Sequence, residues 1–140
     1  MANTKNIHKL RVDASTEHLA QVRDFVAAHA SEMGLSGKDI SDIRLAVDEA
    51  YTNIIKHAYR NQSSNPVEIE IGHNSTELWI SLIDQGDSFN PSEYKEPDIL
   101  QRIKDKKRGG MGVYLIRKLM DNVQYNTKGK TNEIRMVKNL

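Results

Sequence analysis

Apolar residues recur at two different spacings along the chain, and these spacings predict helices and strands. From Ser15 to Gly34 the apolar side chains are three or four residues apart, which predicts a helix that Ser15 caps and Gly34 ends. A longer helix is predicted from Ser36, where Asp39 completes a capping box, to Ala58, or about six turns at 3.6 residues each. Its apolar positions are Ile40, Ile43, Val47, Ala50, Tyr51, Ile54 and Ala58.

A spacing of two predicts strands in the rest of the chain. Residues 7–12 alternate weakly, residues 67–71 and 78–83 form one predicted hairpin, and residues 122–127 and 131–138 form a second. A third helix is predicted between the hairpins, with apolar positions Val113, Leu115, Ile116, Leu119 and Met120. This order predicts an α+β fold, a two-layer sandwich in which helices cover one face of a mostly antiparallel, mixed sheet.

Composition narrows the class of protein. With 140 residues, of which 38% are hydrophobic and 28% charged, the chain fits one globular domain over residues 1–140. A net charge of +1 disfavours direct nucleic-acid binding, and the lack of cysteine excludes disulfides and thiolate metal sites. The first residues lack the apolar core of a signal peptide, and no apolar run approaches the roughly 20 residues that cross a membrane. We therefore expect a cytoplasmic protein with no membrane partner.

Two polar pairs stand at positions that suit chemistry. Glu49 and Asn53 lie four residues apart on the long predicted helix, away from its apolar stripe. A carboxylate there can accept a proton, and an amide oxygen suits Mg²⁺. Asp84 and Gly86 follow a predicted strand, where aspartate can accept a hydrogen bond and glycine lets a flat ligand approach the backbone. Taken alone, the first pair also fits a solvated helix face, and the second an ordinary turn.

A glycine-rich loop precedes the third predicted helix and contains Gly109, Gly110 and Gly112. Its backbone N–H groups and the positive end of the helix favour a phosphate group, although a flexible hinge has the same composition. The loop is not a P-loop, because no Gly-Lys-Ser/Thr sequence follows it. It is not a Rossmann turn either, because the segment before it, residues 104–108, is basic and is not an apolar strand.

In this order the three motifs resemble the N box and the two glycine boxes of the Bergerat (GHKL) ATP-binding domain. Histidine kinases, type II topoisomerases and a group of small serine kinases share this domain. The matching segments are residues 48–59, 84–86 and 110–113, and the resemblance runs from about Ile7 to the C-terminus. The chain is most similar to the anti-sigma factor serine/threonine kinases, which consist of this domain and little else. We therefore expect neither the dimerisation helices of a histidine kinase nor the transducer domain of a topoisomerase.

The resemblance assigns roles to the two polar pairs. It implies that Asn53 holds a Mg²⁺ ion that bridges the phosphates of ATP. Glu49 would act as the general base toward a serine or threonine hydroxyl of a partner protein. Asp84 would accept a hydrogen bond from the adenine amino group, and Gly86 would line the adenine pocket.

Further roles follow from the same resemblance. Gly110 and Gly112 would donate backbone N–H groups to the phosphates. A lid over residues 90–108 would cover the nucleotide, and Arg108 would lie near the terminal phosphate. Thr131, which opens the last predicted strand, resembles the threonine that the family places on the adenine side.

The implied function is that of an ATP- and Mg²⁺-dependent serine/threonine kinase that is also an anti-sigma factor. It would phosphorylate an anti-anti-sigma protein of the STAS type, sequester a sigma factor and form a homodimer. Two alternatives remain: a binding module that uses the nucleotide only as a switch, and a switch kinase of the same family in a stress-signalling complex. Glu49 favours a kinase over a pure switch, because a switch needs no base at that position. The sequence does not separate the two kinases.

Overall fold

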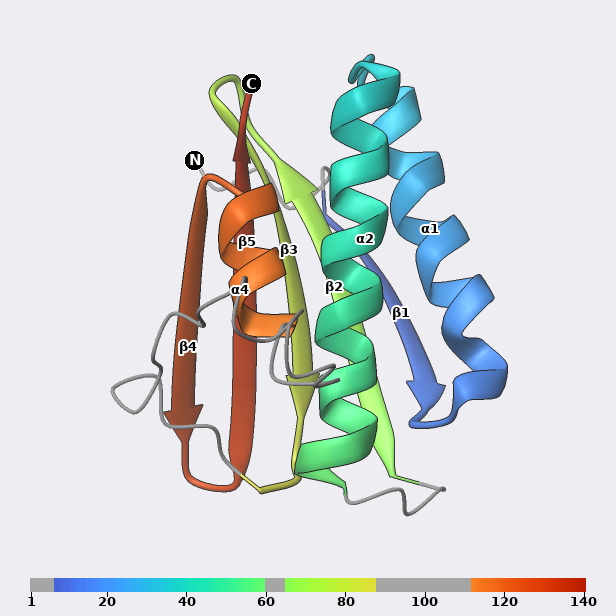
Figure 1. Ribbon diagram of the computed structural model, residues 1–140, viewed down its shortest axis with the longest axis vertical. Helices are drawn as coiled ribbons and strands as arrows, with labels where there is room; N and C mark the ends of the chain where they lie inside the picture. The colour runs from blue at the N-terminus through green and yellow to red at the C-terminus, as the bar shows by residue number, and fades with distance from the viewer. Residues whose placement is uncertain (1–6, 60–64, 88–111) are drawn as a thin grey trace, which may run out of the picture.

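The computed structural model describes residues 7–59, 65–87 and 112–140. Within them, five strands form one sheet in the order β1-β2-β3-β5-β4, and the helices pack on one of its faces (Figure 1). The strands are β1 (His8–Asp13), β2 (Pro66–His73), β3 (Glu77–Asp84), β4 (Asn122–Lys128) and β5 (Thr131–Asn139). The helices are α1 (Leu19–Glu32), α2 (Gly37–Asn53) and α4 (Gly112–Leu119), with a 3₁₀ turn (Thr16–His18) before α1 and a π-helical turn (Ile54–Ala58) after α2. The predicted element order and α+β class are confirmed.

All four strand pairings of the described sheet are antiparallel, so it contains no parallel pair of the kind that a mixed sheet has. The reason is the place of β5. The chain leaves β3, passes through α4 and returns in β4, which therefore runs in the same direction as β3 (Figure 1). Strand β5 lies between these two strands and is antiparallel to both.

The core lies between the sheet and the helices, and the strand register builds it in rows. Ile69 pairs with Leu82, and Leu82 pairs with Ile134 on the other side of β3. In the next row Ile80 lies between Ile71 and Met136 in the same way. All six side chains are buried, because alternate positions of each strand point toward the helices.

The sequence predicts the start of α2 and the end of α1 correctly, whereas Ser15 caps the 3₁₀ turn before α1 and not α1 itself. The Ser36 hydroxyl accepts a hydrogen bond from the Asp39 backbone N–H at 3.1 Å, which caps α2. Gly34 follows α1 with φ of 80°, the left-handed conformation that glycine adopts most easily. Tyr51 is fully buried on α2, and its hydroxyl donates to the Ser15 carbonyl at 2.6 Å. This bond fixes α2 against the corner between β1 and α1.

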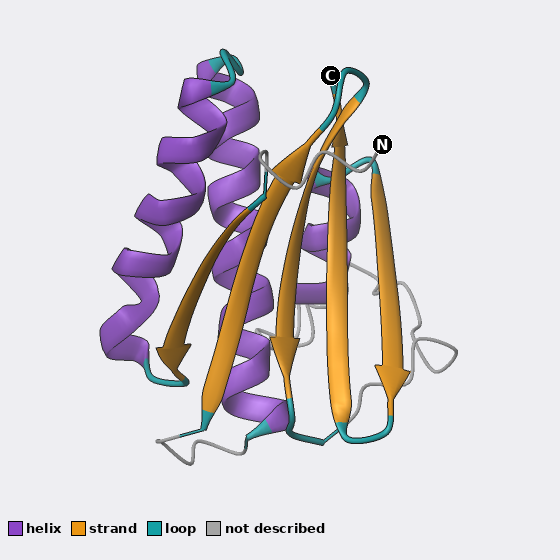
Figure 2. Ribbon diagram, turned by 180° about the vertical axis from the view of Figure 1, so that it is seen from behind, coloured by secondary structure: helices purple, strands orange, loops and turns teal. Residues whose placement is uncertain are grey.

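No described helix covers the opposite face of the sheet (Figure 2). Trp79 lies on that face, with the guanidinium of Arg135 4.8 Å from the centre of its ring. In the described part of the chain, no helix has both the length and the apolar character that a membrane span needs.

Candidate functional site

The segment that follows α2 has an unusual backbone. The Tyr59 N–H donates to the Ile54 carbonyl, five residues back, at 2.9 Å, so the turn is π-helical. The long predicted helix therefore ends at Asn53 as an α-helix and continues to Ala58 as a wider turn. Single π-helical turns are frequently found at functional sites. Here the turn begins directly after the predicted metal ligand, Asn53.

The π-helical turn supports the loop after β3. The Ala58 carbonyl accepts a hydrogen bond from the Asp87 N–H at 2.8 Å. A Cβ atom at Gly86 would overlap the Ala58 carbonyl oxygen and would lie 2.6 Å from its carbonyl carbon. Only glycine fits at position 86, because the two backbones approach too closely for any side chain. The sequence predicts this glycine as a pocket residue, and the structure gives it a packing role as well.

Tyr59 fixes the same loop from inside the core. Its hydroxyl donates to the Pro66 carbonyl at 2.7 Å and accepts from the Gln85 N–H at 2.8 Å. A tyrosine hydroxyl is protonated at neutral pH and can keep both bonds there, and burial raises the pKa of the Tyr59 phenol further. The start of β2 and the end of β3 are thereby joined through one side chain.

Asp84, at the end of β3, is a buried carboxylate with one oxygen already engaged. Its Oδ1 atom accepts from the Gly86 N–H at 2.9 Å and from the Asn132 side-chain amide at 3.0 Å. The same Asn132 nitrogen donates to the Gly86 carbonyl at 2.8 Å. Within the described residues no donor contacts Oδ2. The carboxylate is therefore held in one orientation, with one oxygen left to accept a hydrogen bond from a ligand.

Asn132 is not among the residues that the sequence motifs indicate, although the chain contains a signal for it. Ile134 and Met136 of β5 face the core, so the alternation places Asn132 on the same side of the sheet. The register pairs Asn132 with Asp84 on one side and with Thr127 on the other. The Thr127 hydroxyl donates to the side-chain oxygen Oδ1 of Asn132 at 3.1 Å, which turns the side-chain nitrogen toward Asp84. Finding this residue from the sequence requires the pairing of β3 with β5.

Glu49 and Asn53 lie on α2, one turn apart and half-buried. Neither side chain has a hydrogen bond or an ion pair within the described part of the chain. Their neighbour Asp48 does, since its Oδ2 atom lies 3.2 Å from Nη1 of Arg23 on α1. The ion pair engages Asp48, whereas the Glu49 carboxylate and the Asn53 amide have no partner among the described residues. A carboxylate and an amide oxygen in this arrangement fit a base and a ligand of a hard cation.

The structure locates the remaining predicted residues only in part. Arg108, Gly110 and the predicted lid over residues 90–108 lie outside the described residues. Gly112 is the first residue of α4. Thr131 is half-buried at the start of β5 and pairs with Lys128 across the hairpin. Its role toward a nucleotide stays a prediction.

The predicted groups lie toward one end of the sheet. The π-helical turn after α2, the end of β3 and the start of β5 meet there, as the contacts of Ala58, Gly86 and Asn132 show (Figure 1). Helix α4 runs beside α2 in the opposite direction, so its first residue points toward the same end (Figure 1). In the described residues no three histidine, aspartate or glutamate side chains are grouped as a metal site. A cation here would take its other ligands from the bound molecule and from water.

Comparison with known proteins identifies relatives over most of the chain. Residues 12–138 match the histidine kinase-like ATPase domain family. The serine-protein kinase RsbW of Bacillus velezensis is 32% identical over 129 residues, which is 89% of this chain and 80% of that protein. The same values hold for RsbW of Bacillus subtilis. RsbW of Bacillus mycoides is 34% identical over 120 residues, covering 83% of this chain and 74% of that protein.

Two solved structures share the fold. One contains the RsbU and RsbW domains of Rv1364c from Mycobacterium tuberculosis, with a TM-score of 0.68 and 16% identity. The match covers 94% of this chain and 31% of that one. The other is the SiaB–SiaC complex from Pseudomonas aeruginosa, with a TM-score of 0.66 and 12% identity, covering 91% of this chain and 88% of that one.

Proposed function

Because this chain belongs to the histidine kinase-like ATPase family, we propose that it is an ATP-dependent serine/threonine kinase. The family and the kinase class expected from the sequence are confirmed by relatives that are named serine-protein kinases at 31–34% identity. The observation that carries the proposal is the pair of open side chains on α2. Glu49 and Asn53 have no partner in the described chain. They lie toward the end of α2, on the side of the molecule where β3 ends at Asp84 and Gly86 follows it.

We propose that Asp84 and Gly86 bind the adenine end of ATP and that Asn53 lies at its phosphate end. The Oδ2 atom of Asp84, which no donor contacts among the described residues, accepts from the adenine amino group, and Gly86 lets the base lie against the backbone. Asn53 provides an oxygen ligand for Mg²⁺, which neutralises phosphate charge when it is bound. Phosphate contacts from Gly110, Gly112 and Arg108, and an adenine-side contact from Thr131, belong to the same proposal.

The chemistry that we propose is direct transfer to a hydroxyl group. The serine oxygen of the partner attacks the terminal phosphorus, and the bond from that phosphorus to the bridging oxygen of ADP breaks. Glu49 accepts the hydroxyl proton as the new bond forms.

We propose that the acceptor is an anti-anti-sigma protein of the STAS type and that the chain also binds a sigma factor, as a homodimer in the cytoplasm. The curated relatives are named serine-protein kinases, which supports a protein as the phosphate acceptor. The sheet face that no described helix covers offers a surface for a second copy (Figure 2).

Release of ADP tests the proposed function. With Mg-ATP and a STAS-type protein from the same organism, we expect ADP to form until it equals the amount of acceptor protein, and then to stop. Alanine in place of the acceptor serine should abolish ADP formation. ADP that accumulates without any acceptor would indicate an ATPase, and no ADP with any acceptor would indicate a nucleotide-switched binding module.

Removal of magnesium should weaken ATP binding. If Asn53 and the phosphates share one ion, EDTA should raise the Kd for ATP about tenfold or more, equal to about 1.4 kcal/mol. Isothermal titration calorimetry measures this directly. Adenosine has no phosphate and should bind equally well with and without EDTA. In Asn53→Ala the response to EDTA should be smaller, and an unchanged response would remove Asn53 from the metal site.

A further inference from the structure

Lys138 is a lysine on the core side of the sheet, where a charge is costly. It follows Ile134 and Met136 on the helix-facing side of β5 and pairs with Leu78, which is fully buried. Only 12% of its side chain is exposed. An ammonium group in such a place needs partners that replace water.

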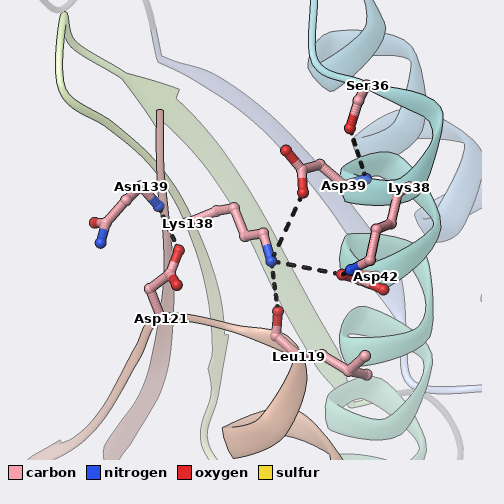
Figure 3. Close-up of polar contacts among 8 residues, drawn as sticks. All are labelled: Ser36, Lys38, Asp39, Asp42, Leu119, Asp121, Lys138 and Asn139. Carbon is pink, nitrogen blue, oxygen red and sulfur yellow. Dashed lines mark hydrogen bonds and ion pairs between the residues drawn. The ribbon is translucent and has the colours of Figure 1, made fainter.

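Those partners come from two helices. Lys138 Nζ donates to the Leu119 carbonyl at 2.8 Å and lies 3.6 Å from Asp42 Oδ2 and 3.9 Å from Asp39 Oδ1 (Figure 3). Leu119 is the last residue of α4, whose final carbonyls have no partner within the helix and carry its negative dipole end. Asp39 and Asp42 belong to the first turns of α2. One side chain of β5 thus holds the end of α4 and the beginning of α2 together.

Two backbone contacts on either side of Lys138 strengthen this connection. The Val137 carbonyl accepts from the Asp121 N–H at 2.9 Å. The Asn139 N–H donates to the Asp121 side chain at 2.7 Å (Figure 3). Three consecutive residues of β5, 137–139, therefore hold the segment 119–121, and we name this set of contacts the β5 clamp.

The β5 clamp fixes one end of a short helix whose other end points toward the proposed phosphates. Helix α4 has eight residues and is about 12 Å long at 1.5 Å per residue. A shift of its clamped C-terminal end along α2 therefore moves Gly112 by the same amount, because a helix of two turns does not stretch. The proposed adenine contact of Asp84, and the Asn132 amide that orients this carboxylate, come from β3 and β5 and do not depend on α4.

We propose that Lys138 is a positioning residue for nucleotide phosphates, acting through α4. It sets the position of Gly112 relative to Glu49 and Asn53. This position decides whether α4 and α2 can contact the phosphates at the same time. The inference rests on the proposed ATP site, and it adds a residue at the far end of α4 that touches no nucleotide.

Lys38 offers a matched control for the charge of Lys138. Its ammonium lies 2.9 Å from the same Asp42 Oδ2 atom, but its side chain is 82% exposed and it is not among the residues of the β5 clamp. The hydrogen bond from Lys38 lowers the pKa of Asp42, and the charge of Lys138 adds to this effect. Lys38→Met thus removes a cation from Asp42 and leaves the hold on α4 intact.

The test compares ATP, ADP and adenosine binding by calorimetry in Lys138→Met, Lys38→Met and the wild type. We expect Lys138→Met to raise the Kd for ATP and ADP about tenfold, and the Kd for adenosine less than twofold. Lys38→Met should bind all three as the wild type does. Equal weakening of ATP and adenosine in Lys138→Met would mean a general structural role, and no weakening would mean no role. Either result overturns the inference.

Two further measurements distinguish a failure of this inference from misfolding of the variant and from a failure of the proposed function. Asp121→Ala loosens the same β5 clamp without leaving Asp39 and Asp42 short of a cation, and circular dichroism reports whether each variant folds. If Lys138→Met does not fold, Asp121→Ala must show the same split between ATP and adenosine, and its absence would overturn the inference. A wild type that does not bind Mg-ATP would contradict the proposed function itself.

Discussion

Replacing Glu49 with glutamine is expected to lower the rate of phosphate transfer about 10²–10⁴-fold while ATP still binds. Glutamine keeps the shape of the side chain and its place one turn before Asn53, but it cannot take a proton. The loss falls on the chemical step because Glu49 has no hydrogen bond or ion pair in the described chain that folding depends on. Initial rates of transfer from labelled ATP to the acceptor protein, run beside nucleotide calorimetry, measure both effects.

Glu32→Gln is the matched control for this change. Glu32 ends α1, and its side chain is 73% exposed, so the same loss of charge should leave the transfer rate unchanged. Full transfer activity in Glu49→Gln would place the base elsewhere. A parallel loss of ATP affinity would show that Glu49 contributes to nucleotide binding and not only to proton transfer.

Replacing Asp84 with asparagine is expected to weaken ATP binding about ten- to one-hundredfold, from the loss of a charged hydrogen bond worth about 1.5–3 kcal/mol. The fold determines how the new amide is oriented. The Gly86 N–H and the Asn132 amide both donate to Oδ1, so the asparagine oxygen must take that position. Its NH₂ group then replaces Oδ2 and meets the adenine amino group, which is also a donor.

The same reasoning predicts a change of base preference in Asp84→Asn. Inosine triphosphate carries a carbonyl in place of the adenine amino group, so it can accept from the new amide. The ratio of ATP to inosine triphosphate affinity should therefore fall sharply, with a melting temperature close to that of the wild type. Asp24→Asn, an exposed change on α1, should alter neither value. Normal ATP binding in a correctly folded Asp84→Asn variant would show that the adenine assignment is wrong.

The sequence predicts the elements of this fold well because side-chain spacing reflects which face is buried. Alternation in residues 67–71 and 78–83 predicts β2 and β3, and Ser36 predicts the start of α2. The π-helical turn is different, since Ile54 and Ala58 keep the four-residue spacing of an α-helix. The change lies in backbone hydrogen bonds, where the Tyr59 N–H reaches back five residues. The spacing of the apolar side chains therefore does not predict the π-helical turn.

The parts of the site that depend on strand order were also beyond the sequence. Asn132 contacts Asp84 only because β5 lies between β3 and β4, an order that the chain does not follow. From the sequence alone, Lys138 is an ordinary polar residue near the end of a predicted strand. Its alternation with Ile134 and Met136 places it on the core side, but its partners on α2 and α4 are set by tertiary packing.

Mapping the transferred phosphate tests the kinase function most directly. The wild-type protein is incubated with Mg-ATP and the STAS-type acceptor, and both proteins are analysed by mass spectrometry of their peptides. We expect one phosphate on a serine or threonine of the acceptor, none on this chain, and none on either protein when EDTA is added. Phosphate on a histidine of this chain, or an unmodified acceptor in the presence of bound Mg-ATP, would contradict direct transfer from ATP to a partner hydroxyl with Glu49 as the base.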